Sequence, residues 1–236
     1  MALKNVLLVV AAAMAGVGLV SADDGVTAAA RHGWKNLAKE DNFDGQSISK
    51  DWSLYNGPGH NGKGRRSPSA ISVHNGILTI TGSTSGTTGG MAWHPGQQYG
   101  RWEARARYPA GTPAYHNVLL LWPDKEDWSI GGEIDYSEVG DGDRQHLEFF
   151  LHYGRDNRQE IGSANVDMTT WHNYAVEWTP EHVAGFLDGR EYFRTNKREA
   201  IPPRSMHATI QLDWFPDHHP RGTGKMEVDW IRQYKL

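Results

Sequence analysis

Residues 101–108 read Arg-Trp-Glu-Ala-Arg-Ala-Arg-Tyr, in which charged and apolar side chains alternate without a break. Because successive side chains of a β-strand point to opposite faces, this pattern predicts a strand with one face against a core and the other against water or a ligand. The same alternation marks 172–178 and 226–230. It assigns three tryptophans to the core, namely Trp102, Trp178 and Trp230.

The rest of the chain continues this strand-rich pattern. Residues 118–122 form a continuous apolar run, which is consistent with a strand covered on both sides. The pairs at 75–76 (Asn-Gly) and 188–189 (Asp-Gly) separate strand-like runs and favour tight hairpin turns. Residues 28–37 predict a short helix, and 56–69 predict a long exposed loop. We expect one all-β domain of two antiparallel sheets, because no long helices alternate with the strands as they do around a parallel sheet.

The composition excludes several classes of function. The chain has 236 residues, of which 22% are charged and 38% hydrophobic, and its formal net charge is -4. This balance argues against a disordered chain and against electrostatic capture of nucleic acid, so no nucleic-acid partner is expected. The absence of cysteine excludes disulfides, thiolate nucleophiles and cysteine-based metal sites. The 27 glycines and 10 tryptophans suit tight turns and flat apolar faces, and therefore an all-β sugar-binding protein.

The N-terminus has the pattern of a secretory signal peptide. Lys4 precedes an apolar run over 6–20, and small residues at 20–22 form a cleavage site. We expect residues 1–22 to be removed and the protein to be secreted or held in the cell envelope, without membrane contact. The apolar run is shorter than the roughly 20 residues that span a bilayer, and an uncleaved anchor is the alternative reading.

Three acidic residues stand close together in the strand-like run 131–138, Gly-Gly-Glu-Ile-Asp-Tyr-Ser-Glu. In a regular strand Glu133 and Asp135 share a face, whereas Glu138 would point into the core. An ionised carboxylate in the core would be costly, so either the strand ends before Glu138 or a β-bulge turns Glu138 back to the acidic face. We predict a bulge near 136–137.

With such a bulge, three carboxyl groups line one open face, and their crowding raises the proton affinity of at least one of them. Glycoside hydrolysis needs one carboxylate to attack the anomeric carbon and one carboxylic acid to protonate the leaving oxygen. A separation of roughly 5 to 5.5 Å between the two gives retention of configuration. By spacing alone, a solvated acidic strand face explains the triplet equally well.

These residues resemble the signature of glycoside hydrolase family 16, Glu-x-Asp-x-x-Glu after a glycine, matched here by Gly132, Glu133, Asp135 and Glu138. Further segments that look like the family's recurring segments follow in the expected order: 40–45, 76–80, 99–105, 174–180, 188–189 and 228–231. The resemblance implies a concanavalin A-like β-jelly-roll sandwich. It places a catalytic domain at 40–236, after an N-terminal segment at 23–39.

The resemblance also implies a role for each acid. Glu133 matches the nucleophile, Glu138 the general acid and then base, and Asp135 the residue that tunes Glu133. His152, on the following strand, matches a family histidine expected beside the cluster, and a structural histidine is the alternative. No cofactor is required, and a structural calcium is left open by the resemblance. No group of acids and histidines has spacing diagnostic of a metal site, so no metal ligand is predicted.

A saccharide groove should combine aromatic platforms with hydrogen-bonding side chains, because sugar rings have apolar faces edged by hydroxyls. The candidates for substrate binding are His152, Trp128, Trp122, His116, Tyr115, Trp214 and Arg105. His116 stands where members of the family often carry a tryptophan platform, which leaves the preferred polysaccharide open. The two arginines at 65–66 read as solvated loop charge.

The cluster and the resemblance together predict a secreted, monomeric, retaining endo-glycoside hydrolase. Its substrate is a β-linked polysaccharide, and a β-1,3-containing glucan is favoured. A non-catalytic, lectin-like carbohydrate-binding sandwich is the alternative from another class, because a fold does not fix a function. The presence of both glutamates disfavours a pure binder. A transglycosylase would use the same intermediate with a sugar acceptor, and the sequence does not separate it from a hydrolase.

Overall fold

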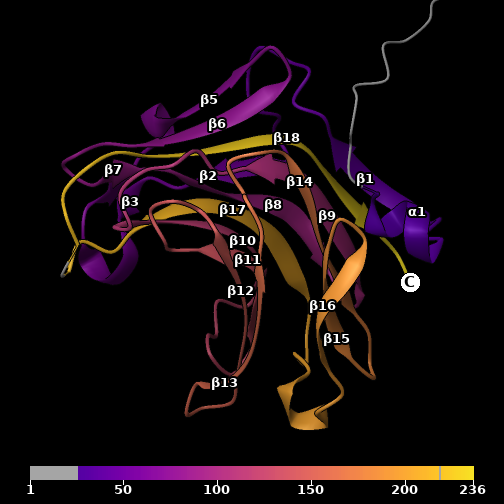
Figure 1. Cartoon of the computed structure of the whole chain (residues 1–236). Helices are drawn as coiled ribbons and strands as arrows, with labels where there is room; N and C mark the ends of the chain where they lie inside the picture. Colours follow the sequence, from indigo (N-terminus) through magenta and orange to yellow (C-terminus); the bar gives the residue numbers. More distant parts are fainter. Residues whose placement is uncertain (1–25, 218) are drawn as a thin grey trace, which may run out of the picture.

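The computed structural model describes residues 26–217 and 219–236. The predicted signal peptide at 1–22 and the first residues of the N-terminal segment lie outside this range. Two large antiparallel sheets share one hydrophobic core (Figure 1). The predicted all-β fold of two antiparallel sheets is therefore confirmed. Within the described residues, no helix is both long and apolar enough to cross a membrane.

We call the first sheet sheet A. Seven of its strands form a hydrogen-bonded row, and an eighth, β1 (Leu37–Asp41), pairs with β18. The row runs β16 (Arg190–Thr195), β15 (Val183–Leu187), β14 (His172–Trp178), β9 (Gly100–Arg107), β18 (Gly224–Tyr234), β6 (Ile77–Gly82), β5 (Ile71–His74).

The second sheet, sheet B, has seven strands and contains the acidic run of the sequence. Across the sheet these are β13 (Arg158–Asn165), β12 (His146–Tyr153), β11 (Glu133–Val139), β10 (Tyr115–Pro123), β17 (Met206–Trp214), β8 (Gly90–Gln97), β2 (Trp52–Leu54).

The segment predicted as one exposed loop, 56–69, is more ordered than expected. It contains two short strands of a third sheet, β3 (Gly57–Pro58) and β4 (Arg65–Arg66), and β4 pairs in parallel with β7 (Thr87–Thr88). Three short 3-10 helices complete the described elements, at His60–Gly62, Pro68–Ala70 and Arg198–Ala200. Backbone pairing with β3 and β7 therefore fixes the position of β4.

The alternation of charged and apolar residues over 101–108 decides the packing of β9. Trp102, Ala104, Ala106 and Tyr108 are all fully buried between the sheets. The indole of Trp102 stacks on that of Trp178 in the neighbouring strand, with 6.2 Å between ring centroids. The core positions predicted for this strand are confirmed.

Trp230 is the exception among the tryptophans assigned to the core. The pairing of β18 with β9 shifts by one residue between Val228 and Trp230. This irregularity turns Trp230 to the outer face of sheet A, where the guanidinium of Arg232 lies 4.2 Å from its ring centroid. Ile231 takes the fully buried position instead. The core assignment of Trp230 is therefore wrong, because the period of two does not extend across a bulge.

Both predicted hairpin turns are present, and the predicted helix is shorter than expected. The turns at 75–76 and 188–189 have positive φ at both residues and join β5 to β6 and β15 to β16. Helix α1 covers Ala28–His32 rather than 28–37. It ends because Gly33 adopts the left-handed conformation, with φ 69°, that terminates many helices.

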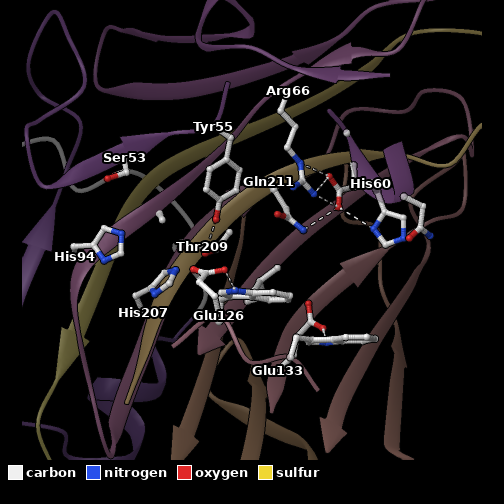
Figure 2. A pocket seen from close by; sticks show the side chains of 17 residues that line it. Ser53, Tyr55, His60, Arg66, His94, Glu126, Glu133, His207, Thr209 and Gln211 are labelled. Carbon is white, nitrogen blue, oxygen red and sulfur yellow. Dashed lines mark hydrogen bonds and ion pairs between the residues drawn. The ribbon is translucent and has the colours of Figure 1, made fainter. Parts of the chain in front are cut away.

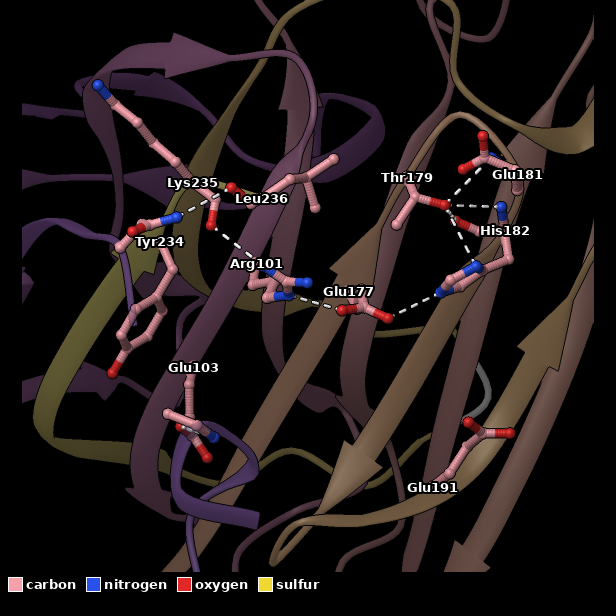
Figure 3. A network of polar contacts seen from close by, with 12 residues as sticks. Arg101, Glu103, Glu177, Thr179, Glu181, His182, Glu191, Tyr234, Lys235 and Leu236 are labelled. Carbon is pink, nitrogen blue, oxygen red and sulfur yellow. Dashed lines mark hydrogen bonds and ion pairs between the residues drawn. The ribbon is translucent and has the colours of Figure 1, made fainter. Parts of the chain in front are cut away.

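The outer face of sheet A carries ion pairs (Figure 3). The Arg101 Nε–H donates a hydrogen bond to Glu177 at 2.6 Å, and the second oxygen of Glu177 lies 2.8 Å from His182 Nε2. Burial opposes ionisation of this carboxyl, but the hydrogen bonds from Arg101 and His182 outweigh it and hold the pKa of Glu177 below its usual range. Charge pairing thus stabilises this part of the surface.

Glu103 lies beneath α1 on the same face. Its oxygens accept hydrogen bonds from the backbone N–H groups of Ala28 and Ala29, at 2.5 and 3.2 Å, and so tie α1 to sheet A. Burial raises the pKa of Glu103 to about 7, although the two N–H donors oppose the rise. The folded protein therefore disfavours the ionised form of this side chain.

We predict that Glu103→Gln stabilises the protein at pH 8 but has little effect at pH 4.5. A carboxyl whose pKa rises from 4.5 to about 7 on folding contributes stability that falls as the pH rises between these values. Glutamine has no charge to bury and keeps an oxygen that accepts a hydrogen bond. The gain in the free energy of unfolding at pH 8 should be on the order of 1–3 kcal/mol, measured by denaturant titration.

Glu177→Gln is the matched control for this measurement. Because the folded pKa of Glu177 is lowered, its stabilising contribution is present above the unfolded pKa, and the variant should lose stability at pH 8. A shift of both variants in the same direction at pH 8 would contradict the assignment of Glu103.

Candidate active site

Strand β11 contains the predicted bulge. In its pairing with β10, the consecutive positions 119–120 face Ser137 and Asp135, so Tyr136 is an extra residue without a partner. The pairing of β11 with β12 shifts at the same place, between Asp135 and Glu138. The bulge predicted near 136–137 is confirmed.

The bulge turns two consecutive side chains toward the core. Tyr136 and Ser137 are both fully buried, and the Ser137 hydroxyl lies 2.8 Å from the hydroxyl of Tyr108, which follows β9 in sheet A. Glu138 therefore returns to the outward face of sheet B, where it shares a cavity wall with Glu133 and Asp135. One extra residue thus places all three carboxyl groups on the same open face.

This face of sheet B is hollowed into a cleft (Figure 2). Two adjoining cavities, of about 510 and 260 Å³, form it, and Figure 2 draws the side chains that line the larger one. Their shared walls make the cleft continuous and contain His60, Trp128, Glu133, Gln211 and Asp213. Glu133 therefore lies where the two cavities meet, and a ligand that fills both would pass over it.

Two of the acids have partners from neighbouring segments. The indole N–H of Trp128 donates a hydrogen bond to Glu133. Asp135, only 4% exposed, has one oxygen 3.5 Å from His152 Nε2. The other ring nitrogen of His152 lies 2.8 Å from the side-chain oxygen of Asn157, which fixes the ring orientation. His152 therefore lies beside the acidic cluster, where the sequence comparison predicted it.

Glu138 has a separate partner, His116, on the adjacent strand β10. Glu138 Oε1 and His116 Nδ1 are 2.7 Å apart. The imidazole packs against the ring of Phe215, with centroids 4.2 Å apart, and lies over Gly140, where a Cβ atom would come within 2.6 Å of it. Only a glycine leaves room for the ring at that position, so His116 is held firmly against Glu138.

Burial controls the electrostatics of the cluster. Burial is the main cause that raises the pKa of Glu133, and the charge of Asp135 raises it further. The charge of His152 and the hydrogen bond from Trp128 oppose this rise. Burial and the charges of Glu138 and Asp213 raise the pKa of Asp135. The pKa values of Glu133 and Asp135 therefore both lie above those of isolated carboxyl groups.

Sequence reasoning missed an ion pair at the far wall of the cleft. Arg66, predicted as solvated loop charge, binds both oxygens of the buried Asp213 at 2.6 and 2.8 Å. Burial opposes the ionisation of Asp213, but His60 and Arg66 outweigh it and hold the pKa of Asp213 below its usual range. The two partners are 147 residues apart, and no local pattern in the sequence links them.

Three of the predicted substrate-binding residues line the cleft, and a fourth stands behind it. Trp122, Trp128 and His152 are in its walls, and the Trp122 indole N–H donates to Glu126 at 2.8 Å. His116 contacts the cleft residue Glu138. Their positions are compatible with sugar binding, and their roles stay predictions.

Tyr115 does not face the cleft. It is fully buried between the sheets, and its hydroxyl donates to the backbone carbonyl of Ser83 at 2.6 Å. Tyr115 and His116 are neighbours in β10, so their side chains point to opposite faces. The prediction that Tyr115 binds substrate is therefore wrong.

Trp214 and Arg105 also lie away from the cleft. Trp214 packs against the core beneath Gly86, where a Cβ atom would lie 2.3 Å from the indole. Arg105 is on the outer face of sheet A, paired with Asp229 at 2.6 Å and stacked over Trp171. Both substrate-binding predictions are wrong, because the sequence did not reveal which sheet face is hollowed.

Residues 61–232 match the model described as "Glycosyl hydrolases family 16". The chain belongs to this family. The acidic cluster and its bulge lie inside the matched range, so the family 16 signature and the open acidic face coincide.

Solved structures confirm the jelly-roll fold of this family 16 chain. The laminarinase catalytic domain of Thermotoga maritima MSB8 aligns with a TM-score of 0.76 and 21% identity, over 86% of this chain and 98% of that chain. The laminarinase from Rhodothermus marinus gives 0.70 and 24%, over 86% and 97%. Identities this low bear on the fold alone.

The similarity in sequence is highest over a shorter region. A "Beta-glucanase" of Rhodothermus marinus is 32% identical over 130 residues, which cover 50% of this chain and 44% of that protein. The chain spans less than half the length of this and other curated relatives. Another of these relatives, an "Endo-1,3-1,4-beta-glycanase EglC" of Rhizobium meliloti, is 26% identical over 72% of this chain and 40% of that protein.

Among the described residues, two groups of three side chains could hold a metal ion. One is the acidic cluster with its histidine, Glu133, Asp135 and His152, and the other is His94, Asp124 and His207. Each contains imidazole, whereas calcium favours oxygen ligands. Neither group fits the structural calcium left open by the family resemblance, which stays a prediction.

We predict that Asp135→Asn lowers the pKa of Glu133 in this family 16 site. The charge of Asp135 raises the pKa of Glu133, and asparagine removes that charge at nearly the same volume. Carbon-13 NMR titration of labelled glutamate carboxyl groups would measure the change. Asp229→Asn, on the outer face of sheet A, is the control and should leave the titration of Glu133 in place. An unchanged Glu133 titration in Asp135→Asn would show that the two carboxyl groups do not interact.

Proposed function

We propose that this family 16 protein is a secreted, retaining endo-hydrolase of a β-1,3-containing glucan. The observation that carries the proposal is the bulge in β11, which places Glu133, Asp135 and Glu138 together in one open cleft. Retaining glycosidases use a pair of carboxyl groups on one face of the cleft, one as nucleophile and one as acid and base. The signal-peptide pattern at 1–22 supports secretion.

The proposed chemistry has two steps. First, a carboxylate oxygen of Glu133 bonds to the anomeric carbon while the glycosidic carbon–oxygen bond breaks and Glu138 gives its proton to the leaving oxygen. In the second step Glu138 takes a proton from water, the water oxygen bonds to the anomeric carbon, and Glu133 leaves as a carboxylate. Two inversions at the same carbon retain its configuration.

The neighbours of each acid suit its proposed role. Glu133 must be ionised to attack, and the hydrogen bond from the Trp128 N–H would stabilise that charge. Glu138 must direct its proton at one oxygen of the substrate. His116, at 2.7 Å from Glu138, is the positioning residue for that carboxyl group in our proposal.

The shape of the cleft and the relatives support the substrate class. The cleft is open and continuous, so it suits a chain that passes through it rather than a chain end. The exposed indole of Trp128 and the half-buried indole of Trp122 provide flat apolar surfaces for sugar rings. The similar proteins are named as a beta-glucanase and as laminarinases.

We predict that the protein releases reducing sugar from laminarin, and that Glu133→Gln lowers this rate by at least about three orders of magnitude. Glutamine is nearly isosteric and keeps the fold, but it cannot form the covalent intermediate. The measurement is reducing-sugar release from a panel of laminarin, mixed-linkage glucan, agarose, carrageenan and xyloglucan, with product sizes by chromatography. Glu191→Gln, the same change at a site on sheet A away from the cleft, is the control and should keep full activity.

The outcomes of this panel separate the alternatives. Glucan binding without reducing-sugar release would indicate a carbohydrate-binding protein and would overturn the proposal. Products longer than the starting oligosaccharides would indicate transglycosylation. Full activity of Glu133→Gln would remove Glu133 from the mechanism.

A further inference from the structure

A histidine-rich cluster lies at one end of the cleft, apart from the acidic cluster. His94 is in β8, His207 is in β17, and Asp124 follows the last residue of β10. These strands are neighbours in sheet B, because β17 pairs with β10 on one side and with β8 on the other. One ligand atom from each of the three side chains lies within 4.8 Å of the other two. Figure 2 shows the rings of His94 and His207 side by side.

Two of the three side chains are held in place by the fold. His207 is only 2% exposed, and its Nδ1 lies 2.8 Å from Asp124 Oδ1. The other oxygen of Asp124 accepts a hydrogen bond from the hydroxyl of Ser205. Gly96 leaves room for the carboxylate, since a Cβ atom there would come within 2.5 Å of it. The carboxylate and the buried imidazole therefore form a preorganised pair.

The hydrogen-bonded pair of Asp124 and His207 does not account for the position of His94. The hydrogen bond between Asp124 and His207 joins Oδ1 to Nδ1 and does not involve His94. The exposed ring of His94 stands with its centroid 4.6 Å from that of His207. Among the described residues, no hydrogen-bond partner is found for the His94 imidazole. A nearby cation, the Lys39 ammonium, donates to the backbone oxygens of Trp93 and Pro95 rather than to the carboxylate.

We propose that His94, Asp124 and His207 bind a divalent transition-metal ion of the zinc class. Two imidazoles and one carboxylate are the donor set that zinc uses with three protein ligands, whereas calcium and magnesium favour oxygen donors. His94 and His207 come from adjacent strands and Asp124 directly follows the next strand, so the sheet sets the spacing of the three side chains. Their fourth side is open, because His94 and Asp124 are exposed.

The ion would lie in the wall of the same cleft as Glu133. His207 and Glu133 both line the larger cavity, and β10 separates their strands. Two strand spacings correspond to about 10 Å, so the ion is too far from Glu133 to take part in bond cleavage. Its open coordination positions face water or the hydroxyl groups of a saccharide. This inference is independent of whether the protein hydrolyses glucan.

The test is calorimetric titration of the purified chain, without a polyhistidine tag, with ZnCl₂ and separately with CaCl₂. We expect saturable zinc binding at a single site and no calcium binding at that site. His94→Ala and Asp124→Asn change exposed side chains, which protects the fold, and each should weaken zinc binding at least about tenfold, the loss that even outer-shell changes cause at metal sites. Circular dichroism would verify that both variants are folded.

Two controls make the result specific. His74→Ala removes an exposed histidine from β5 and should bind zinc like the unaltered chain. Glu133→Gln removes a ligand from the other potential metal group and should also bind normally. The inference is overturned if the unaltered chain does not bind zinc, if His94→Ala and Asp124→Asn both bind within about twofold of it, or if Glu133→Gln alone loses binding.

Discussion

The pleat of a β-strand sends residues an odd number of positions apart to opposite faces, and Glu138 lies three positions after Asp135. A regular strand would therefore place the carboxylate of Glu138 among the apolar side chains between the sheets, where an unpaired charge is strongly disfavoured. The extra residue in β11 removes this conflict. It buries a tyrosine and a serine in succession and returns Glu138 to the cleft. The acidic cluster depends on this local irregularity.

The outer faces of the two sheets differ in how their charged side chains are arranged. Sheet B presents a cleft in which burial and neighbouring charges raise the pKa values of Glu133 and Asp135, and indole and imidazole groups surround them. The outer face of sheet A instead presents arginine–carboxylate pairs such as Arg101 with Glu177, in which hydrogen bonds and opposite charges favour the ionised forms. The same residue types thus serve opposite purposes. Burial beside like charge raises the pKa of Glu133, whereas hydrogen bonds from Arg101 and His182 lower the pKa of Glu177.

Local patterns in the sequence predicted most of the fold. The alternation in β9 fixed its buried residues, the Asn-Gly and Asp-Gly pairs fixed two hairpins, and the parity of the three acids predicted the bulge itself. Each of these features is decided by residues that are close in the sequence. Trp230 shows the limit of reading too short a stretch, because the alternation was followed only over 226–230, and Arg232, which an unbroken period of two would turn into the core, lies just beyond it.

The site was harder to predict where it depends on contacts between distant segments. Successive side chains of a strand point to opposite faces, so Tyr115 and His116 cannot both face the substrate. This alternation does not show which face of the sheet is hollowed. The pairing of Arg66 with Asp213 required the third sheet to bring β4 next to β17. The group formed by His94, Asp124 and His207 required the order of three strands across sheet B. Pairing order is a property of the whole chain, and no single stretch of sequence encodes it.

The central claim is that Glu133 forms a covalent bond to the sugar in the cleft made by the bulge. The most direct measurement is peptide mass spectrometry of the protein after incubation with 2-deoxy-2-fluoro-laminaribiosyl fluoride, whose fluoride leaves without acid assistance and whose ester intermediate breaks down slowly. The account predicts a single fluoroglycosyl ester on Glu133, with the other acids of the cluster unlabelled. A label on another residue, or turnover of the reagent with inversion and no label at all, would contradict it.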